Sequence, residues 1–304
     1  MKSKMWVYIL LSILFLYLAI LIYNRTNFTA AGTEGFRQAE PFVVRRDNDI
    51  YDDFYAEIYD RLMMPEKRVP FEIDAIVANT QASPKSAFLE IGSGTGYLVK
   101  SLKERGFDAY GIDRSQAMVD YSISKYPEVP VKCGTVADPI TFEKNTFSHI
   151  LCMYFTVYQF ADKVAFFRNC YHWLLPNGCL VLHLVDPDQY DAVVPRGKPD
   201  TVFSMRDISP AKRITNTEID FGDFYYTSGL TSSPDEPNTV TITEKFTDRR
   251  THSVRQNEQT LTMEPVKKVL QIARYCGFII QGKMDYKECN GDSHQYLYFL
   301  EKAL

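Results

Sequence analysis

The chain has 304 residues, of which 45% are hydrophobic and 14% aromatic, so one large or two small domains can form around a sizeable core. Its formal net charge is −4 and no long basic stretch is interleaved with aromatic residues, which disfavours nucleic acid as the main substrate. The six cysteines and five histidines are dispersed and contain no Cys-x-x-Cys pair, so the sequence predicts neither a disulfide framework nor a metal site.

The N-terminal segment is an apolar run over residues 5–23, in which Ser12 is the only clearly polar residue. A helix of this length spans roughly 28 Å, about the hydrocarbon core of a bilayer. A cleaved secretory signal is the alternative, since residues 29–31 resemble a small-residue cleavage site, but the run exceeds the usual signal-peptide core of about 7–15 residues. We therefore expect an N-terminal cap at 1–4, a single membrane-spanning helix at 5–23, a polar linker at 24–48 and a folded domain at 49–304.

The folded domain begins with a predicted helix over residues 51–62. Its aromatic residues stand at 51, 54, 55 and 59, and offsets of three and four place them on one helical face. This face either packs on a sheet or covers a ligand as a lid. A second amphipathic stretch spans residues 69–78, before the break at Ser83-Pro84.

Short apolar strands and helical stretches then alternate as far as residue 185. This alternation predicts parallel strands joined by right-handed helical crossovers. In such a sheet the ligand lies outside the carboxyl ends of the strands, where Glu90, Asp113, Thr135 and Tyr154 fall. We expect strands at 87–91, 109–113, 130–133, 149–153 and 179–185, and helices at 97–105, 115–124 and 161–175.

A glycine-rich turn follows the first of these strands, where residues 88–97 read Phe-Leu-Glu-Ile-Gly-Ser-Gly-Thr-Gly-Tyr. Backbone approaches a ligand closely where Cβ atoms are missing, and the N–H groups at the start of the next helix favour a carboxylate or phosphate. A dinucleotide fingerprint would need glycine where Tyr97 stands, and the Gly-Lys-Ser/Thr of a P-loop is absent. The turn therefore indicates a nucleotide-binding site that is neither a dinucleotide fingerprint nor a P-loop.

The alternation breaks after Asp186, and an antiparallel β insertion is expected within residues 191–263. Its segments are rich in Thr, Val, Ile, Phe and Tyr and are separated by turn-forming residues. A helix that stops at Gly277 then precedes the last two strands. The expected strands are 214–226, 239–246, 253–263, 278–286 and 295–301, and the helix is 264–276.

The turn and the elements after it resemble class I S-adenosylmethionine-dependent methyltransferases. The resemblance rests on Glu-x-Gly-x-Gly-x-Gly at 90–96, Gly-Ile-Asp-Arg-Ser at 111–115, a fourth strand at 147–154 and Trp-Leu-Leu-Pro-Asn-Gly at 173–178, and it covers about residues 50–304. It implies an α/β, Rossmann-like fold with a seven-stranded, mostly parallel sheet, helices on both faces, and the β insertion after strand five. It also implies S-adenosyl-L-methionine as the cofactor. A reductase or a silent Rossmann-like domain is the alternative interpretation of the glycine turn.

The resemblance assigns the methionine part of the cofactor to the glycine turn, with Glu90 beside it, and the two ribose hydroxyls to Asp113. Asp113 could instead cap the helix that begins near Ser115. The adenine contact stays open, because Thr135-Val136 or Asp138 occupies the place where relatives carry Asp or Asn. The expected cofactor-binding residues are Glu90, Gly92, Ser93, Gly94, Gly96, Asp113, Arg114, Thr135, Val136 and Tyr154.

On the acceptor side, His183 and Asp186 near the end of the fifth strand are candidates for a general base or for groups that orient the acceptor. A lone histidine on an apolar strand is otherwise a core residue. The Asn-Pro-Pro-Tyr signature of amide or nucleobase-nitrogen methylation is missing. The aromatic residues of the insertion either line the substrate site or form the insertion's own core or a homodimer contact. The expected substrate residues are Tyr51, Tyr55, Tyr225 and Tyr226.

These observations predict a membrane-anchored methyltransferase that acts on a small-molecule or lipid-like acceptor, with aromatic walls that also suit an amine. A catalytically silent cofactor-binding module and a protein methyltransferase are the alternatives. The positive charges that flank residues 5–23 are nearly balanced, whereas the unpaired cysteines and the need for cytosolic cofactor favour a cytosol-facing domain on a single-pass membrane protein.

Overall fold

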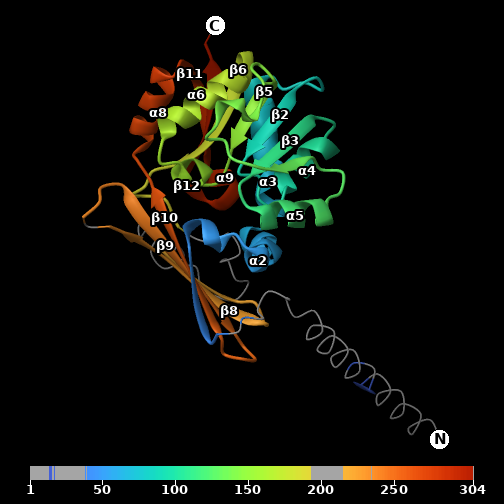
Figure 1. Ribbon diagram of the computed structural model, residues 1–304, viewed down its shortest axis with the longest axis vertical. Helices are drawn as coiled ribbons and strands as arrows, with labels where there is room; N and C mark the ends of the chain where they lie inside the picture. Colours follow the sequence, from blue (N-terminus) through green and yellow to red (C-terminus); the bar gives the residue numbers. More distant parts are fainter. Residues whose placement is uncertain are drawn as a thin grey trace, which may run out of the picture.

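The computed structural model describes residues 14, 15, 17, 38, 40–192, 215–233 and 235–303. They form two sheets, and the N-terminal helix of the folded part lies between them (Figure 1). The predicted membrane span at 5–23 lies outside the described residues, apart from Leu14, Phe15 and Tyr17. Within the described part of the chain, no helix combines the length and the apolar character needed to cross a bilayer.

The larger sheet has seven strands in the order β11-β12-β6-β5-β2-β3-β4. Neighbouring strands from β6 to β4 run parallel, and β12 is antiparallel to both β6 and β11. The mostly parallel, Rossmann-like fold class is therefore confirmed. Its strands are β2 (Ala87–Ile91), β3 (Asp108–Asp113), β4 (Val131–Cys133), β5 (Phe147–Cys152), β6 (Leu174–Val185), β11 (Phe278–Tyr286) and β12 (Asp292–Lys302).

Helices cover both faces of this sheet, as a parallel sheet requires. One apolar cluster joins α3 and α4 to one face, and another joins α6 and α8 to the opposite face. Further along, α5 packs beside β4 and against α2. The bounds are α3 (Pro65–Thr80), α4 (Tyr97–Glu104), α5 (Gln116–Lys125), α6 (Lys163–Trp173) and α8 (Val266–Tyr275), with short helices η3 (Pro139–Thr141), η4 (Thr156–Gln159) and α9 (Lys287–Asn290).

A buried histidine on β5 illustrates how closely the core is packed. The His149 ring stacks on Phe88 with 4.5 Å between ring centroids. Its two nitrogens lie within hydrogen-bond distance of the hydroxyl oxygens of Ser148 (2.8 Å) and Thr80 (3.0 Å). Burial lowers the pKa of His149 to about 4, so the imidazole is neutral at pH 7.

The smaller sheet has five strands in the order β1-β10-β9-β8-β7, and β7 to β10 are antiparallel. This is the expected β insertion. One detail of the prediction is wrong: residues 214–226 are not a single strand, because the chain turns at Gly222 with φ of +87°. The insertion strands are β7 (Asn216–Asp220), β8 (Phe224–Ser232), β9 (Thr239–Asp248) and β10 (Val254–Thr262).

The predicted linker at 24–48 is also partly wrong, because its last residues are structured. Strand β1 (Phe42–Arg46) pairs in parallel with β10, with Val43 opposite Arg255, and the 3-10 helix η2 (Asp47–Ile50) follows it. Phe42, Val43 and Val44 favour a strand, but a five-residue run that ends in two arginines does not form one without a partner. It becomes a strand because β10 offers it an open edge.

Helix α2 (Asp53–Met63) joins the two sheets (Figure 1). Asp52 caps its N-terminus by accepting a hydrogen bond from the backbone N–H of Tyr55 at 3.2 Å. Phe54, Ile58 and Leu62 recur at helical spacing and are buried in a cluster with phenylalanines of β8 and β9. The helix thereby carries its tyrosine-bearing side to the space between the sheets.

Candidate active site

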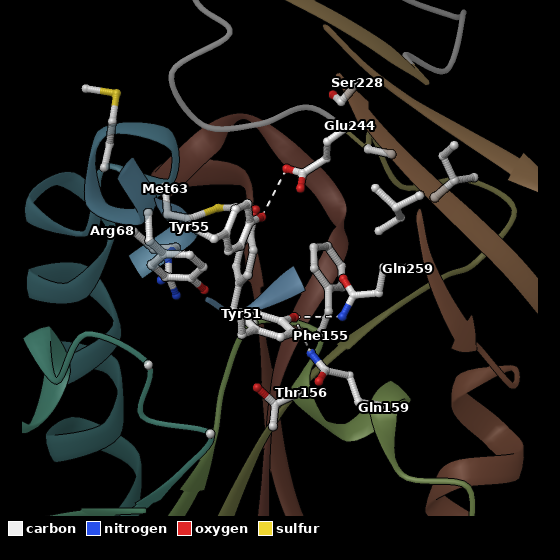
Figure 2. Close-up of a pocket in the computed structure, with 18 of the residues that line it drawn as sticks. Tyr51, Tyr55, Met63, Arg68, Phe155, Thr156, Gln159, Ser228, Glu244 and Gln259 are labelled. Carbon is white, nitrogen blue, oxygen red and sulfur yellow. Dashed lines mark hydrogen bonds between the residues drawn. The ribbon is translucent and has the colours of Figure 1, made fainter. Parts of the chain in front are cut away.

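A cavity of about 1150 Å³ lies between the two sheets. Its wall runs from the carboxyl ends of β2, β3 and β4, across α2 and α3, to the inner face of the smaller sheet (Figure 2). The larger sheet reverses its strand order between β2 and β5, which is the position where open α/β sheets bind their ligands. Both walls of this cavity therefore belong to one site.

The glycine turn forms the cofactor end of the cavity. Gly92, Gly94 and Gly96 all have positive φ, at +72°, +52° and +76°. A Cβ on Gly92 would lie 2.6 Å from Thr156 Cγ2, and one on Gly96 would lie 2.2 Å from Ser122 Oγ, so tight packing excludes side chains there. Around Gly94 the nearest atom would be 3.8 Å away. Gly92 and Gly94 line the cavity, so backbone is presented directly to a ligand, whereas Gly96 caps α4.

Asp113 lines the cavity at the end of β3. Its Oδ2 accepts the N–H of Gly94 at 2.8 Å and its Oδ1 accepts the N–H of Ser115 at 2.9 Å. Burial raises the pKa of Asp113, and these two hydrogen bonds oppose the rise. The helix cap is Ser115, whose Oγ accepts the N–H of Met118, so the alternative role of Asp113 as N-cap is wrong. Each Asp113 oxygen keeps a lone pair that can accept a ribose hydroxyl.

Glu90 lies behind the glycine turn and is buried. Burial raises its pKa well above the ordinary value, Glu72 and Asp113 add to the rise, and Arg68 together with the N–H of Val99 opposes it. Because Val99 is in the first turn of α4, Glu90 acts on the start of that helix and does not form part of the cavity wall. Ser93 is likewise buried and lies outside the wall.

The ends of β3, β4 and β5 supply the next part of the wall. Arg114, Thr135, Val136 and Tyr154 all line the cavity. The guanidinium of Arg114 donates to Gln159 Oε1 at 2.9 Å. Asp138 instead accepts the N–H of Ile140 in η3, so of the two options for the adenine region the structure presents Thr135-Val136 to the cavity.

The two candidate catalytic residues do not reach the cavity. His183 is buried on β6, and its Nδ1 accepts the N–H of Phe155 at 3.4 Å. Burial, with a smaller contribution from Arg68, lowers the pKa of His183 to about 3. Asp186 accepts the N–H of Asp188 at 3.4 Å in the turn after β6. Neither side chain lines the site, whereas Tyr154 and Phe155, which pack against the His183 ring, do line it.

A buried ion pair under the acceptor side was not predicted from the sequence. Arg68 Nη1 lies 2.5 Å from Glu72 Oε1, and the hydroxyl of Tyr286 donates to the same oxygen at 2.7 Å. The Arg68 guanidinium also lies over the Tyr154 ring, 4.7 Å from its centroid. Arg68 lines the cavity and brings positive charge to its wall (Figure 2).

Two of the four expected substrate residues lie near the start of α2: Tyr51 just before the helix and Tyr55 in its first turn. The Tyr51 oxygen accepts hydrogen bonds from Gln259 at 2.7 Å and from Gln159 at 3.1 Å (Figure 2). Burial raises the pKa of Tyr51 to about 12. The Tyr55 hydroxyl donates to Glu244 of β9 at 3.0 Å. Both tyrosines line the cavity, so α2 bridges the cofactor end and the smaller sheet.

The other two, Tyr225 and Tyr226, lie side by side on β8 but in different surroundings. Tyr226 is fully buried among aromatic residues and donates to Glu244 at 2.8 Å. Tyr225 is 39% exposed and donates to Glu218 at 2.9 Å. Tyr226 therefore belongs both to the core of the insertion and to the cavity wall, so two of the roles expected for these aromatic residues, core and substrate wall, hold for it together.

Comparisons with known proteins agree with this geometry. A family model described as a methyltransferase domain matches residues 89–182. Among curated proteins, none matches the chain significantly.

Solved structures with a similar fold cover nearly the whole folded part, at sequence identities that show the fold alone. The CcbJ methyltransferase from Streptomyces caelestis is 16% identical, with a TM-score of 0.63 over 84% of this chain and 98% of that one. An S-adenosylmethionine-dependent methyltransferase from Clostridium acetobutylicum is 15% identical, with a TM-score of 0.61 over 82% and 98%. The sugar N-methyltransferase KedS8 from Streptoalloteichus is 17% identical, with a TM-score of 0.56 over 81% and 93%.

The open space at Gly94 and the two-oxygen acceptor at Asp113 fit the cofactor of such a domain. The domain match at residues 89–182, together with the Rossmann-like sheet and this site, therefore identifies a methyltransferase domain in the chain, with S-adenosylmethionine as its cofactor.

Proposed function

We propose that the protein methylates a small-molecule acceptor that binds in the cavity between the two sheets. The observation that carries this proposal is the continuity of the cavity wall, from Gly94 and Asp113 to Glu244 and Gln259. One continuous space can therefore hold the cofactor and an acceptor together. The sugar N-methyltransferase among the structures of similar fold supports an acceptor of this size class.

The chemistry supplied by S-adenosylmethionine is a methyl group on a positively charged sulfur. The bond from the acceptor atom to this methyl carbon forms as the carbon–sulfur bond breaks, so the residues of the chain mainly have to align the reactants. Asp113 and the glycine turn would fix the nucleoside and methionine parts at one end. Tyr51 and Tyr55 would position the acceptor at the other end, since their hydroxyls are held by Gln259 and Glu244.

Membrane attachment through residues 5–23, with the folded domain facing the cytosol, is part of this proposal. It rests on the apolar run of the sequence, in which Ser12 is the only clearly polar residue. A lipid-like acceptor would suit an anchored enzyme and the aromatic wall, but the anchor and the cavity are independent observations. Carbonate extraction of membranes tests the anchor: release of the intact protein would contradict it, and protease protection reports which side the domain faces.

Transfer of labelled methyl groups tests the acceptor class. Purified full-length protein would be incubated with methyl-labelled S-adenosylmethionine and with separated metabolite, lipid, protein and nucleic-acid fractions. We expect label in the metabolite or lipid fraction and none with the Asp113→Ala variant. Label that entered only protein or nucleic acid would contradict the proposal, and failure of the wild type to bind the cofactor in calorimetry would remove its basis.

A further inference from the structure

A carboxylate on the smaller sheet faces the cavity from among apolar side chains. Along β9, residues 240, 242, 244, 246 and 248 share one face, on which Glu244 stands among Val240, Ile242 and Phe246. Asp248, at the end of the strand, accepts the N–H groups of Arg250 and Thr251 in the following turn and does not line the cavity. The Glu244 side chain is only 6% exposed, yet it forms part of the cavity wall and points from β9 toward Tyr55 (Figure 2). A buried acidic residue in an apolar row is costly unless something compensates its charge.

The hydrogen-bond partners of Glu244 are all neutral. Its Oε1 accepts the hydroxyls of Tyr55 at 3.0 Å and Tyr226 at 2.8 Å, and its Oε2 accepts the amide of Asn257 at 3.1 Å. Within the described ranges of the chain, no Lys, Arg or His forms an ion pair with it. Three donors orient the carboxylate and none of them carries a positive charge.

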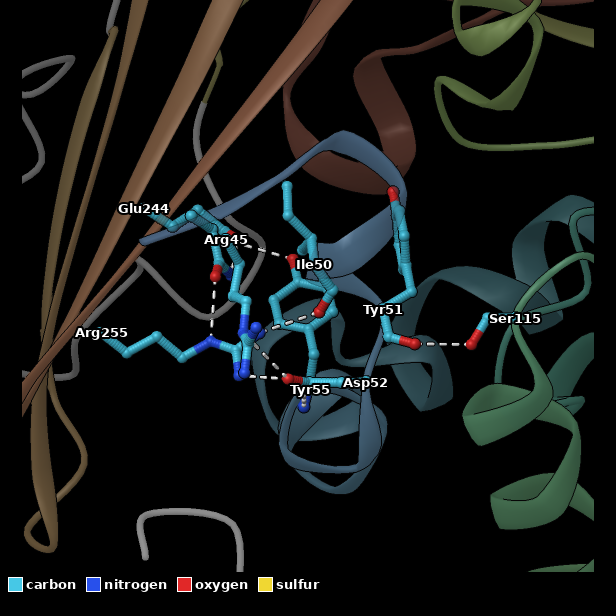
Figure 3. Close-up of polar contacts among 9 residues, drawn as sticks. Arg45, Ile50, Tyr51, Asp52, Tyr55, Ser115, Glu244 and Arg255 are labelled. Carbon is cyan, nitrogen blue, oxygen red and sulfur yellow. Dashed lines mark hydrogen bonds and ion pairs between the residues drawn. The ribbon is translucent and has the colours of Figure 1, made fainter. Parts of the chain in front are cut away.

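The nearby cation on the same sheet, Arg255, is already engaged elsewhere. Its Nη1 pairs with Asp52 at 2.7 Å and its Nη2 donates to the carbonyl of Ile50 at 3.0 Å (Figure 3). Its Nε donates to Asn257 Oδ1 at 2.9 Å. This last bond fixes the orientation of the Asn257 amide, so its NH₂ group faces Glu244. Arg255 therefore orients the partner of Glu244 and neutralises Asp52.

Glu244 retains acceptor capacity after these three hydrogen bonds. A carboxylate has about four lone-pair sites, and three are used, which leaves one on Oε2. Burial raises the pKa of Glu244, and the donors Asn257, Tyr226 and Tyr55, with a smaller contribution from the charge of Arg255, oppose the rise. The tyrosine rings beside it also suit a cation, because aromatic faces attract positive charge.

We propose that Glu244 binds a positively charged nitrogen of the methyl acceptor, so that the acceptor is an amine or carries an ammonium group. This inference rests on the proposed function of the cavity and specifies its substrate class. Glu244 is a specificity-determining residue in this proposal: its charge selects a cationic group, and its three neutral donors hold the carboxylate in place for it.

A matched pair of probes tests the proposal. Cyclohexylamine is a cation at pH 7.5, and cyclohexanol has nearly the same shape without charge. Binding of each to the full-length protein, saturated with S-adenosylhomocysteine, would be measured by ligand-observed NMR titration. We expect the wild type to bind the amine at least about tenfold more tightly than the alcohol, as a charge-assisted hydrogen bond requires.

Two variants locate the effect. Glu244→Gln should reduce the amine-to-alcohol preference to about one while S-adenosylhomocysteine still binds. Glu218→Gln is the control, because Glu218 also lines the cavity and accepts a tyrosine hydroxyl, but it is exposed; this variant should keep the preference.

Equal binding of the two probes by the wild type would overturn the inference, whether or not Glu244→Gln folds. So would a preference that survives in a folded Glu244→Gln variant. Either result with cofactor binding intact would leave the methyltransferase function standing. Absence of cofactor binding in the wild type would instead count against the function itself.

Discussion

Replacement of Asp113 by asparagine tests the cofactor site most directly. In the structure both carboxylate oxygens accept backbone N–H groups, from Gly94 and Ser115. Asparagine keeps one acceptor oxygen and turns an NH₂ group toward the other N–H. At least one charge-assisted hydrogen bond is lost, which costs about 1.5–3 kcal/mol. For a domain of this size each kcal/mol lowers the melting temperature by roughly 2–4 °C.

Cofactor affinity should fall as well, because the ribose hydroxyls lose a charged acceptor. The same 1.5–3 kcal/mol corresponds to a loss of roughly 10- to 150-fold in affinity. Isothermal titration calorimetry measures the affinity and differential scanning calorimetry the stability. Asp138→Asn is the control: this residue caps η3 near the same strand ends but does not line the cavity, so affinity should change less than about twofold. The reasoning would be refuted if Asp113→Asn bound the cofactor within about twofold of the wild type.

Three further predictions concern stability. Gly96→Ala should destabilise the protein, because the added Cβ would strain a backbone with positive φ and would clash with the Ser122 side chain. The double variant Gly96→Ala/Ser122→Ala removes the clash and should melt at a higher temperature than Gly96→Ala alone. Equal melting temperatures would contradict the packing argument. Arg68→Met leaves Glu72 buried without its ion-pair partner and should lower the free energy of unfolding, measured by urea denaturation, by about 3–5 kcal/mol. Adding Glu72→Gln to this variant should restore part of the loss. An unchanged free energy of unfolding in Arg68→Met would show that the pair is dispensable. The pKa of His149 is about 4 in the folded state and about 6.5 unfolded, so the unfolded state binds more protons between these values. Stability should therefore fall by up to about 3 kcal/mol as the pH drops from 6.5 to 4, and His149→Gln should remove that part of the pH dependence; parallel profiles for the two proteins would refute it.

The strands of the larger sheet could be predicted because their signals are local. Strands β2 and β11 have the bounds expected from the sequence: β2 is a mainly apolar run that ends before Gly92, and β11 begins directly after Gly277. Strand β1 could not be predicted, because its partner β10 lies about 210 residues further along the chain. The turn at Gly222 was missed because aromatic residues surround it and continue the β pattern on both sides.

The cofactor side of the site could also be predicted from the sequence, because its residues follow directly after strands. Asp113, Thr135 and Tyr154 lie in the wall for that reason. The acceptor side depends on contacts between distant elements, which no local pattern reveals. Arg68 and Glu72 have the spacing of an ordinary surface pair on a helix, yet α3 places them in the interior. Glu244 did leave a signal, as a charged residue on the apolar face of a strand.

The position of β1 has a consequence for how the protein folds. Its pairing with β10 closes a loop that contains the entire parallel sheet, and the entropy cost of such closure must be met before the pairing can stabilise anything. Contacts of such long sequence separation slow folding. We therefore expect the smaller sheet to gain its fifth strand late, after the larger sheet has formed. Until then the edge of β10 is an unpaired template for other strands, so the chain is most exposed to aggregation in the last stage of its folding.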